Sequence, residues 1–556
     1  MPSSSAVPQP RGHMLCVSAL TLVLDLWGIT RENSMWRDEA ATWAAVHRTV
    51  PQLGNMLGQI DVVHGLYYLF MHGVFQLFGD SLYTLRLPSV VATTCTAAVI
   101  VLLGSRLAGR YAGLAAGLSF ALVPAVQQYA QEGRPYALVM LCVALASWLL
   151  VVSIDDPTAG HWAAYGAVAL TAALLNWFSL LMLTAHAVSI VMTRPARRIV
   201  RRWAVTACTV VLCASPLIVA SQAQSQQIAW IPPVKPSTLL SLLLTLFAGL
   251  ACAWGARAET ADRAAHGAQP TLTAVALPLL GLPPLLLLVV SFAQPVYQTR
   301  YVLFGYLGLA LLIGGACQRL TKRFRGSSQR IGAAVMAIAF VCLLPVQISM
   351  RSSSSRIDDV LFTTHDVAAV REPGDRVLYI PAARRDTALV SPTAFTDAQD
   401  IALAQDPYAS GTLYGRERSP REIADAMLAA DRIIVVSTIR CPRPRQTVTG
   451  PNDRSSPTTS SAAQNQEVTA ARSRCTSAAR AAHQAQVYVT PVMPAADHQP
   501  STAIPTRSAT SSNAASNRLK QFRAIATCFD KLAVHLRMRG GRRETVTHPQ
   551  PCPASV

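Results

Sequence analysis

The chain has 556 residues, of which 51% are hydrophobic and only 14% are charged, and its formal net charge is +19 at pH 7. Soluble domains usually carry about 25% charged residues, so this composition excludes an ordinary soluble protein. The apolar residues occur in repeated runs of spanning length, which predicts a polytopic α-helical membrane protein. The 12 cysteines show neither a CxxC pair nor zinc-ligand spacing, so they indicate no metal site and no disulfide framework.

Residues 14–350 are expected to form the membrane domain. The preceding segment 1–13 is polar and the first apolar run lacks a small-residue cleavage site, so we expect a cytoplasmic tail and a retained helix instead of a cleaved signal peptide. Eleven membrane helices are predicted, at about residues 14–30, 87–104, 111–126, 136–153, 161–175, 177–193, 203–221, 237–256, 271–292, 301–318 and 331–349.

The short loops between these helices indicate the orientation of the chain. Basic residues cluster at 194–202 and at 319–330, and Arg106 and Arg110 flank a third loop. Cytoplasmic loops carry an excess of Lys and Arg, and all three clusters lie on that side if the N-terminus is cytoplasmic. We therefore expect the loop 31–86 and everything after Arg351 to face outward from the plasma membrane.

The first outer loop, residues 31–86, is long for a connector. Its segment Glu39–Val50 has apolar residues at helical spacing, and Leu66–Phe78 is rich in aromatic residues. Amphipathic and aromatic segments of this kind are typical of helices that lie in the plane of the membrane interface.

Residues 351–440 are predicted to form a small extracytoplasmic α/β domain. Val377–Ile380 and Arg432–Ser437 have the composition of strands. Between them, Ser419 and Glu422 have capping-box spacing and predict a helix that continues to Ala430.

The composition changes abruptly at Cys441. Residues 441–556 are dominated by Ser, Thr, Ala, Pro, Gln and Arg, and carry 15 Lys and Arg against 5 Asp and Glu. This composition predicts a disordered basic tail. Because the change follows a predicted strand directly, both a native tail and a frame-shifted or aberrant C-terminus remain as interpretations, and no function is assigned to it.

Three motifs lie in the predicted outer loops. Trp36-Arg37-Asp38-Glu39-Ala40 and His64-Gly65-Leu66-Tyr67-Tyr68 belong to the first, and Tyr129-Ala130-Gln131-Glu132-Gly133-Arg134-Pro135-Tyr136 to the second. Together, and with Gln298-Thr299-Arg300-Tyr301, they resemble the GT-C glycosyltransferases. Within that superfamily they are similar to the protein-mannosyltransferase-like and aminoarabinose-transferase-like branch, including its bacterial mannosyltransferases. The resemblance covers about residues 14–440 and implies a polyprenyl-phosphate-linked sugar donor, with mannose as the implied sugar.

The carboxylates of the first motif suit the acceptor side of such a reaction. A positioned general base typically contributes ~10²–10⁴-fold to a rate, and one carboxylate in a single displacement inverts the anomeric centre. We predict that Asp38 is this base, against the alternative that it caps a helix N-terminus. Glu39 is a second candidate catalytic residue, with acceptor binding, cation binding and helix capping as alternatives.

The other motif residues are candidates for binding the donor. Arg134 suits a phosphate group, although Glu132 and Arg134 could equally form a local ion pair. His64 could bind phosphate or a metal, or be a structural residue; Gly65 stands where this branch often has proline. Family resemblance implies donor contact for Tyr136, Arg300 and Tyr301, whereas an interfacial anchor is the alternative for each.

Metal dependence stays open at the level of sequence, because Asp38, Glu39, Glu132 and His64 could gather around one divalent cation.

The sequence predicts a membrane glycosyltransferase that moves a sugar from its lipid-linked donor to the hydroxyl of an envelope glycolipid, glycan or protein. A flippase or transporter of lipid-linked sugars is the main rival, and would place charges within broken helices near the midplane. A non-catalytic envelope protein is the second rival.

Overall fold

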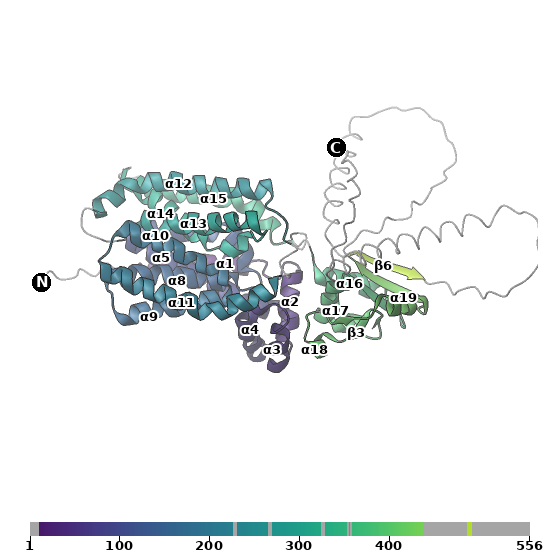
Figure 1. The fold of residues 1–556 in the computed structure, drawn as a ribbon. Helices are drawn as coiled ribbons and strands as arrows, with labels where there is room; N and C mark the ends of the chain where they lie inside the picture. The colour runs from purple at the N-terminus through teal and green to yellow at the C-terminus, as the bar shows by residue number, and fades with distance from the viewer. Residues whose placement is uncertain are drawn as a thin grey trace, which may run out of the picture. The chain divides into compact units, whose positions relative to one another are not determined.

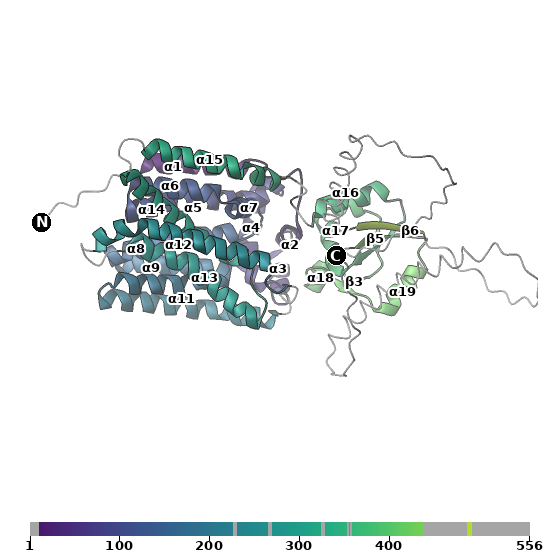
Figure 2. The same ribbon diagram turned by 90° about the horizontal axis from the view of Figure 1, so that it is seen from above.

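The computed structural model describes residues 10–225, 231–264, 270–323, 328–352, 355, 358–437 and 486–491. Most of them are helical, and the long helices run side by side as a bundle (Figures 1 and 2). The bundle helices are α1 (Arg11–Leu26), α5 (Leu82–Ala108), α6 (Arg110–Leu122), α7 (Pro124–Ala130), α8 (Tyr136–Asp155), α9 (Ala159–Leu175), α10 (Leu181–Thr193), α11 (Arg197–Ala223), α12 (Pro236–Ala264), α13 (Leu272–Ala293), α14 (Gly305–Arg323) and α15 (Ser328–Ser349).

Each of the eleven predicted membrane segments falls on a helix of this bundle. Five of the described helices are long and apolar enough to cross a membrane: α5, α8, α11, α13 and the segment Pro236–Gly255 of α12. Several of the others are shorter; the segment predicted at 177–193, for example, begins as a 3-10 turn, Trp177–Leu180, before α10. The predicted class of α-helical polytopic membrane protein is confirmed.

Small residues set the close packing of α5, α6 and α14. A Cβ atom added to Gly104 of α5 would lie only 2.9 Å from the Cα atom of Gly113 in α6. Such a contact is shorter than carbon atoms tolerate, so glycine is needed where these two backbones meet. The pairing of α5 with α6 and α8 fixes the ends of these helices, where the residues of the candidate site lie.

The long first loop folds into short helices: α2 (Arg37–Val46), α3 (Val50–Leu57), a 3-10 turn η1 (Val62–His64) and α4 (Gly65–Phe78). The two helical segments expected here correspond to α2 and α4, and α2 begins two residues earlier than predicted. The Thr49 hydroxyl accepts a hydrogen bond from the Gln52 N–H, which caps α3. The loop is therefore structured along its length, although the sequence signals only two of these elements.

The C-terminal region contains an α/β unit. Its sheet has the order β2-β1-β5-β6, with β1 (Arg376–Ile380) parallel to both β2 (Gln399–Asp400) and β5 (Arg432–Ser437). A separate pair joins β3 (Leu403–Gln405) and β4 (Arg416–Glu417). The helices are α16 (Val360–Val370), α17 (Asp386–Val390), α18 (Pro407–Ser410) and α19 (Pro420–Leu428), and two 3-10 turns, Ala382–Arg385 and Pro392–Phe395, flank α17.

The predicted capping box of Ser419 and Glu422 opens α19, and the two predicted strands are β1 and β5. One segment of the predicted disordered tail differs from the expectation. Residues Gln486–Pro491 form β6, which pairs antiparallel with β5 along six residues. The Val-Tyr-Val-Thr run has strand propensity, and the edge of β5 offers unpaired backbone groups. The rest of the predicted tail lies outside the described residues.

Candidate active site

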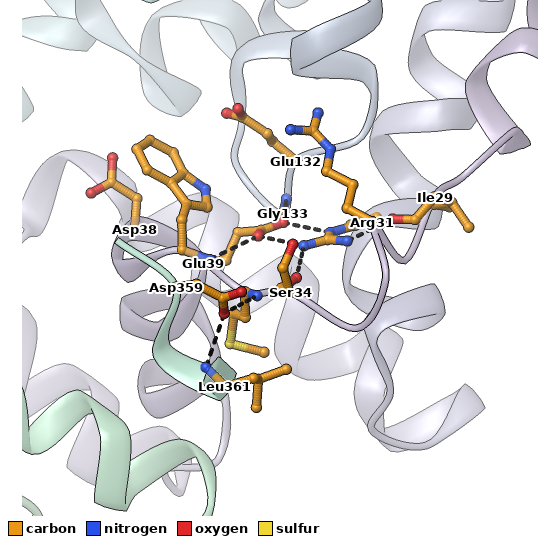
Figure 3. Close-up of polar contacts among 12 residues, drawn as sticks. Ile29, Arg31, Ser34, Asp38, Glu39, Glu132, Gly133, Asp359 and Leu361 are labelled. Carbon is orange, nitrogen blue, oxygen red and sulfur yellow. Dashed lines mark hydrogen bonds and ion pairs between the residues drawn. The ribbon is translucent and has the colours of Figure 1, made fainter. Parts of the chain in front are cut away.

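The two adjacent carboxylates at the start of α2 point in different directions (Figure 3). Both lie in the first turn of the helix, where the N–H ends of the backbone favour negative charge. The side chain of Glu39 is fully buried, whereas that of Asp38 is 28% exposed. The carboxylates therefore occupy two separate environments and have separate partners.

Glu39 is bound within the protein on both of its oxygens. Arg86 at the start of α5 donates to Oε1 from Nε and to Oε2 from Nη2, each at 2.7 Å. The Gly133 N–H also donates to Oε1 at 2.9 Å. This bidentate pair is completely buried and joins α2, α5 and the second loop motif. The geometry favours the structural alternatives for Glu39 over catalysis, because no face of its carboxylate is open to a substrate.

Asp38 is held by a residue from the far end of the chain. Its Oδ2 atom accepts a hydrogen bond from Nη1 of Arg300 at 2.8 Å. Arg300 is 8% exposed, and its guanidinium lies 5.7 Å from the ring centres of Trp36 and Tyr136 and 5.6 Å from that of Tyr301. Three aromatic faces thus surround the cation and favour it electrostatically.

Arg134 and His64 form the next layer. Nη2 of Arg134 lies 2.7 Å from Nε2 of His64, and Nη1 donates to the Asp38 carbonyl oxygen at 3.2 Å and to the Tyr68 hydroxyl at 3.3 Å. Burial, together with the charge of Arg134, lowers the pKa of His64 well below its ordinary value. His64 is therefore neutral, accepts from Arg134 at Nε2 and carries its proton at Nδ1.

That His64 Nδ1 atom is buried and has no hydrogen-bond partner among the described residues. The same holds for Nε of Arg134. Buried donors are nearly always paired. A histidine N–H and a guanidinium N–H that have no partner among the described residues therefore form an arrangement suited to an anion. Arg134 contacts the backbone carbonyl of Asp38 and Arg300 contacts its carboxylate, so both arginines lie next to Asp38.

The remaining predicted residues are distributed around this centre. Tyr136 begins α8, is 3% exposed and contacts Tyr301 at 6.2 Å between ring centres. Tyr301 stacks on Phe178 at 4.8 Å. Glu132 is buried, and its backbone carbonyl oxygen accepts a hydrogen bond from the Ser89 hydroxyl at 2.6 Å. The structure thus brings together Asp38, His64, Arg134, Arg300, Tyr136 and Tyr301. Glu39 is bound separately, by Arg86 and the Gly133 N–H.

The four residues considered as cation ligands do not form such a group. Asp38 faces Arg300, Glu39 faces Arg86, and His64 faces Arg134. Among the described residues, no three His, Cys, Asp or Glu side chains are placed to hold a metal ion. The donor set that these residues form does not fit a bound cation.

Three residues to which the sequence assigned no role in the site, Arg86, Tyr68 and Asp61, take part in the arrangement. Arg86 neutralises Glu39 and also donates to the carbonyl oxygens of Ile29 and Ser34, at 2.6 and 2.7 Å. Tyr68 donates to Oδ2 of Asp61 at 2.5 Å and contacts Arg134. An arginine next to a predicted membrane helix was the available signal for Arg86; nothing in the linear sequence signalled Asp61.

Comparison with known proteins supports the family resemblance. Residues 66–219 match the model of the dolichyl-phosphate-mannose-protein mannosyltransferase family. A search among curated proteins gave no match. Two solved structures of ArnT from Cupriavidus metallidurans resemble the chain, one in the apo state (12% identity, TM-score 0.49) and one bound to undecaprenyl phosphate (13% identity, TM-score 0.46); each match covers 77% of this chain and 93% of the other.

The segment that matches the family model includes Tyr68, Arg86, Glu132, Arg134 and Tyr136, whereas Asp38 and Arg300 lie outside it. The site therefore joins residues of the matched segment to residues on both sides of it. Over residues 66–219, this chain is similar to the dolichyl-phosphate-mannose-protein mannosyltransferases.

Proposed function

We propose that the protein is a membrane glycosyltransferase that moves a sugar from a polyprenyl-phosphate-linked donor to an acceptor hydroxyl, with Asp38 as general base. The observation that carries this proposal is the partly exposed Asp38 carboxylate beside two buried arginines. A base next to a phosphate-binding cluster is what transfer from a glycosyl phosphate requires. The family match over residues 66–219 supports this reaction class.

Asp38 can accept a proton while remaining fixed in place. Its Oδ2 is bound to Arg300, and Oδ1 has no hydrogen-bond partner among the described residues. In the proposed step, Oδ1 takes the proton of the acceptor hydroxyl as the acceptor oxygen attacks the anomeric carbon. The bond from that carbon to the phosphate oxygen breaks, and the polyprenyl phosphate leaves with the electron pair. A single displacement of this kind inverts the anomeric centre.

The leaving phosphate would be bound by the cationic side of the site. Arg134, Arg300 and the Nδ1–H group of His64 provide donors from three different segments of the chain. Charge-assisted hydrogen bonds to phosphate are about twice as strong as neutral ones, and donors that are already positioned need no reorganisation during the reaction. Tyr136 and Tyr301 would act by holding Arg300 between their rings.

The surroundings of the reaction complete the proposal. The positive loops favour a plasma-membrane protein whose active site faces outward, and an envelope glycolipid, glycan or protein would be the acceptor. Mannose is the proposed sugar, on the family resemblance alone. The aromatic-rich α4 and the apolar bundle would keep the lipid-linked donor at the depth of its phosphate headgroup.

The proposal is tested by sugar transfer in membranes that contain the wild type, Asp38→Asn or the control Asp80→Asn at matched protein levels. Asp80 lies in the same loop but its side chain is 59% exposed and pairs only with His47 among the described residues. A panel of labelled polyprenyl-phosphate sugars is supplied. We expect one sugar to reach an acceptor with the wild type and with Asp80→Asn, and not with Asp38→Asn.

Two results would contradict the proposal. Equal transfer by the wild type and Asp38→Asn would show that Asp38 is not the base. Movement of the labelled lipid across the bilayer, without transfer to any acceptor, would instead identify a flippase. A panel that includes mannose and aminoarabinose donors also decides the sugar.

A further inference from the structure

The chain segment that leads into α2 is joined to the start of α16. The Met35 N–H donates to Oδ1 of Asp359 at 3.1 Å, and the Val360 N–H donates to the Met35 carbonyl oxygen at 2.7 Å. Trp36 and Asp359 form an isolated antiparallel bridge. The same Oδ1 atom accepts from the N–H groups of Leu361 and Phe362, so it also caps α16 (Figure 3).

Arg37 makes a second connection one residue before Asp38. Its Nε donates to Oδ2 of Asp386 at 2.7 Å, and its Nη2 donates to the carbonyl oxygen of Ala383 at 3.2 Å. Asp386 is 1% exposed and begins α17, which packs against α2. A buried carboxylate depends on its cationic partner, because an unpaired charge in this position would be strongly unfavourable.

The C-terminal end of α2 is connected to the same α/β unit. Arg48 donates to the carbonyl oxygens of Pro407 and Thr412 at 3.0 and 2.8 Å, and its guanidinium lies 4.9 Å from the ring centre of Tyr408. Arg48 is 1% exposed. Contacts at both ends of a ten-residue helix fix its axis and its rotation, and therefore the direction of Asp38.

We infer that the C-terminal α/β unit is a positioning element of the active site, and that Asp359 and Asp386 are positioning residues for Asp38. This inference rests on the proposed function of Asp38. Neither residue touches the substrate; they act through Met35 and Arg37, which precede the base in the chain. A displacement of about 1 Å at a reacting group can cost on the order of 10²-fold in rate, so loss of these contacts is expected to lower kcat.

The test compares Asp359→Ala with Asp359→Asn in the full-length protein. Asparagine retains an oxygen that can accept from Met35 and Leu361, whereas alanine does not. Ser419→Ala is the matched control, because Ser419 caps α19 in the same unit and has no contact with α2 among the described residues. Two quantities are measured: hydrogen–deuterium exchange of residues 35–46, and sugar transfer with its kcat and donor KM.

We expect Asp359→Ala to speed exchange in residues 35–46 and to lower kcat about 10²-fold with little change in donor KM. Asp359→Asn and Ser419→Ala should retain wild-type behaviour in both measurements. Asp386→Asn is a second variant, which leaves the α16 cap intact. It should also speed exchange in residues 35–46 and lower kcat, but by less than Asp359→Ala.

Unchanged exchange of residues 35–46 in folded Asp359→Ala and Asp386→Asn would overturn the inference. Faster exchange with unchanged kcat would also overturn it, because the contacts would then be irrelevant to Asp38. Failure of the proposed function gives a different result. The wild type would then transfer no sugar, while hydrogen–deuterium exchange would still distinguish Asp359→Ala from Asp359→Asn. In that case the contact between the α/β unit and α2 is supported, and the assigned reaction is wrong.

Discussion

Arg300 donates a hydrogen bond to the Asp38 carboxylate at 2.8 Å, although 262 positions separate the two residues in the chain. The contact joins the start of α2 to the 3-10 turn Thr299–Val302 that precedes α14. Because Arg300 is also surrounded by the rings of Trp36, Tyr136 and Tyr301, its guanidinium is fixed in position and in orientation. The proposed base is therefore held by the same residue that we propose to bind the donor phosphate.

Replacing Arg300 is predicted to reduce transfer. Arg300→Ala removes a positioned charge and should lower kcat on the order of 10²-fold, as loss of one electrostatic donor does in other enzymes. Arg300→Lys should retain part of the activity, because lysine keeps the charge but not the planar donors. The measurement is transfer from the labelled donor, with Arg416→Ala, at an exposed position of β4, as control. An unaltered kcat in Arg300→Ala would remove Arg300 from the site.

The Glu39–Arg86 pair is predicted to govern stability. Arg86→Met leaves the fully buried Glu39 carboxylate without its partner, and breaking such a pair typically costs ~3–5 kcal/mol. Thermal unfolding in detergent is the measurement, and Arg106→Met is the control, because the ion pair of Arg106 with Asp155 is largely solvent-exposed and worth no more than about 1 kcal/mol. Wild-type stability of Arg86→Met would show that the pair does not support the fold.

Gly133 is predicted to tolerate no larger residue. A Cβ atom at this position would lie 2.5 Å from Cγ of Leu85, so Gly133→Ala should destabilise the protein by roughly 1–3 kcal/mol and displace the N–H that binds Glu39. Adding Leu85→Ala should relieve the overlap in part. Gly73→Ala is the control, because nothing lies within 4 Å of its added Cβ. Equal unfolding midpoints for Gly133→Ala and Gly73→Ala would contradict this account.

The pH dependence of stability should carry a contribution from His64. Burial and Arg134 lower its pKa, so below the ordinary histidine value of about 6.5 the unfolded chain binds a proton that the folded chain does not. The stabilisation that neutral His64 contributes is fully present above the ordinary histidine pKa. It is lost as the pH falls toward the pKa of His64 in the folded protein, by up to about 1.4 kcal/mol per pH unit. Thermal unfolding is measured from about pH 7 to pH 5. The unfolding free energy should depend less on pH in His64→Gln than in the wild type or in the control His365→Gln, whose position is exposed. Equal slopes in all three would exclude a buried neutral His64.

The clustering of Asp38, His64, Arg134 and Arg300 could be expected from the order of the motifs, since the predicted topology places all four at the outer side. The different roles of the two adjacent carboxylates, Asp38 and Glu39, could not be predicted from the sequence. Asp38 and Glu39 are adjacent in the sequence and identical in charge, and only the rotation of α2 directs one toward Arg300 and the other into a buried pair with Arg86.

Apolar runs and basic loops were enough to determine the membrane class, the helical segments and the expected orientation, because hydrophobic length and local charge are properties of the linear chain. The strands β1 and β5 and the cap of α19 were also legible locally. Only the tertiary structure decided which residues meet Asp38. Arg300 binds Asp38 directly, whereas Asp386 and Asp359 bind the neighbouring Arg37 and Met35. All three come from segments more than 200 residues away in the chain, and such long-range pairings depend on packing that leaves no periodic signal in the sequence.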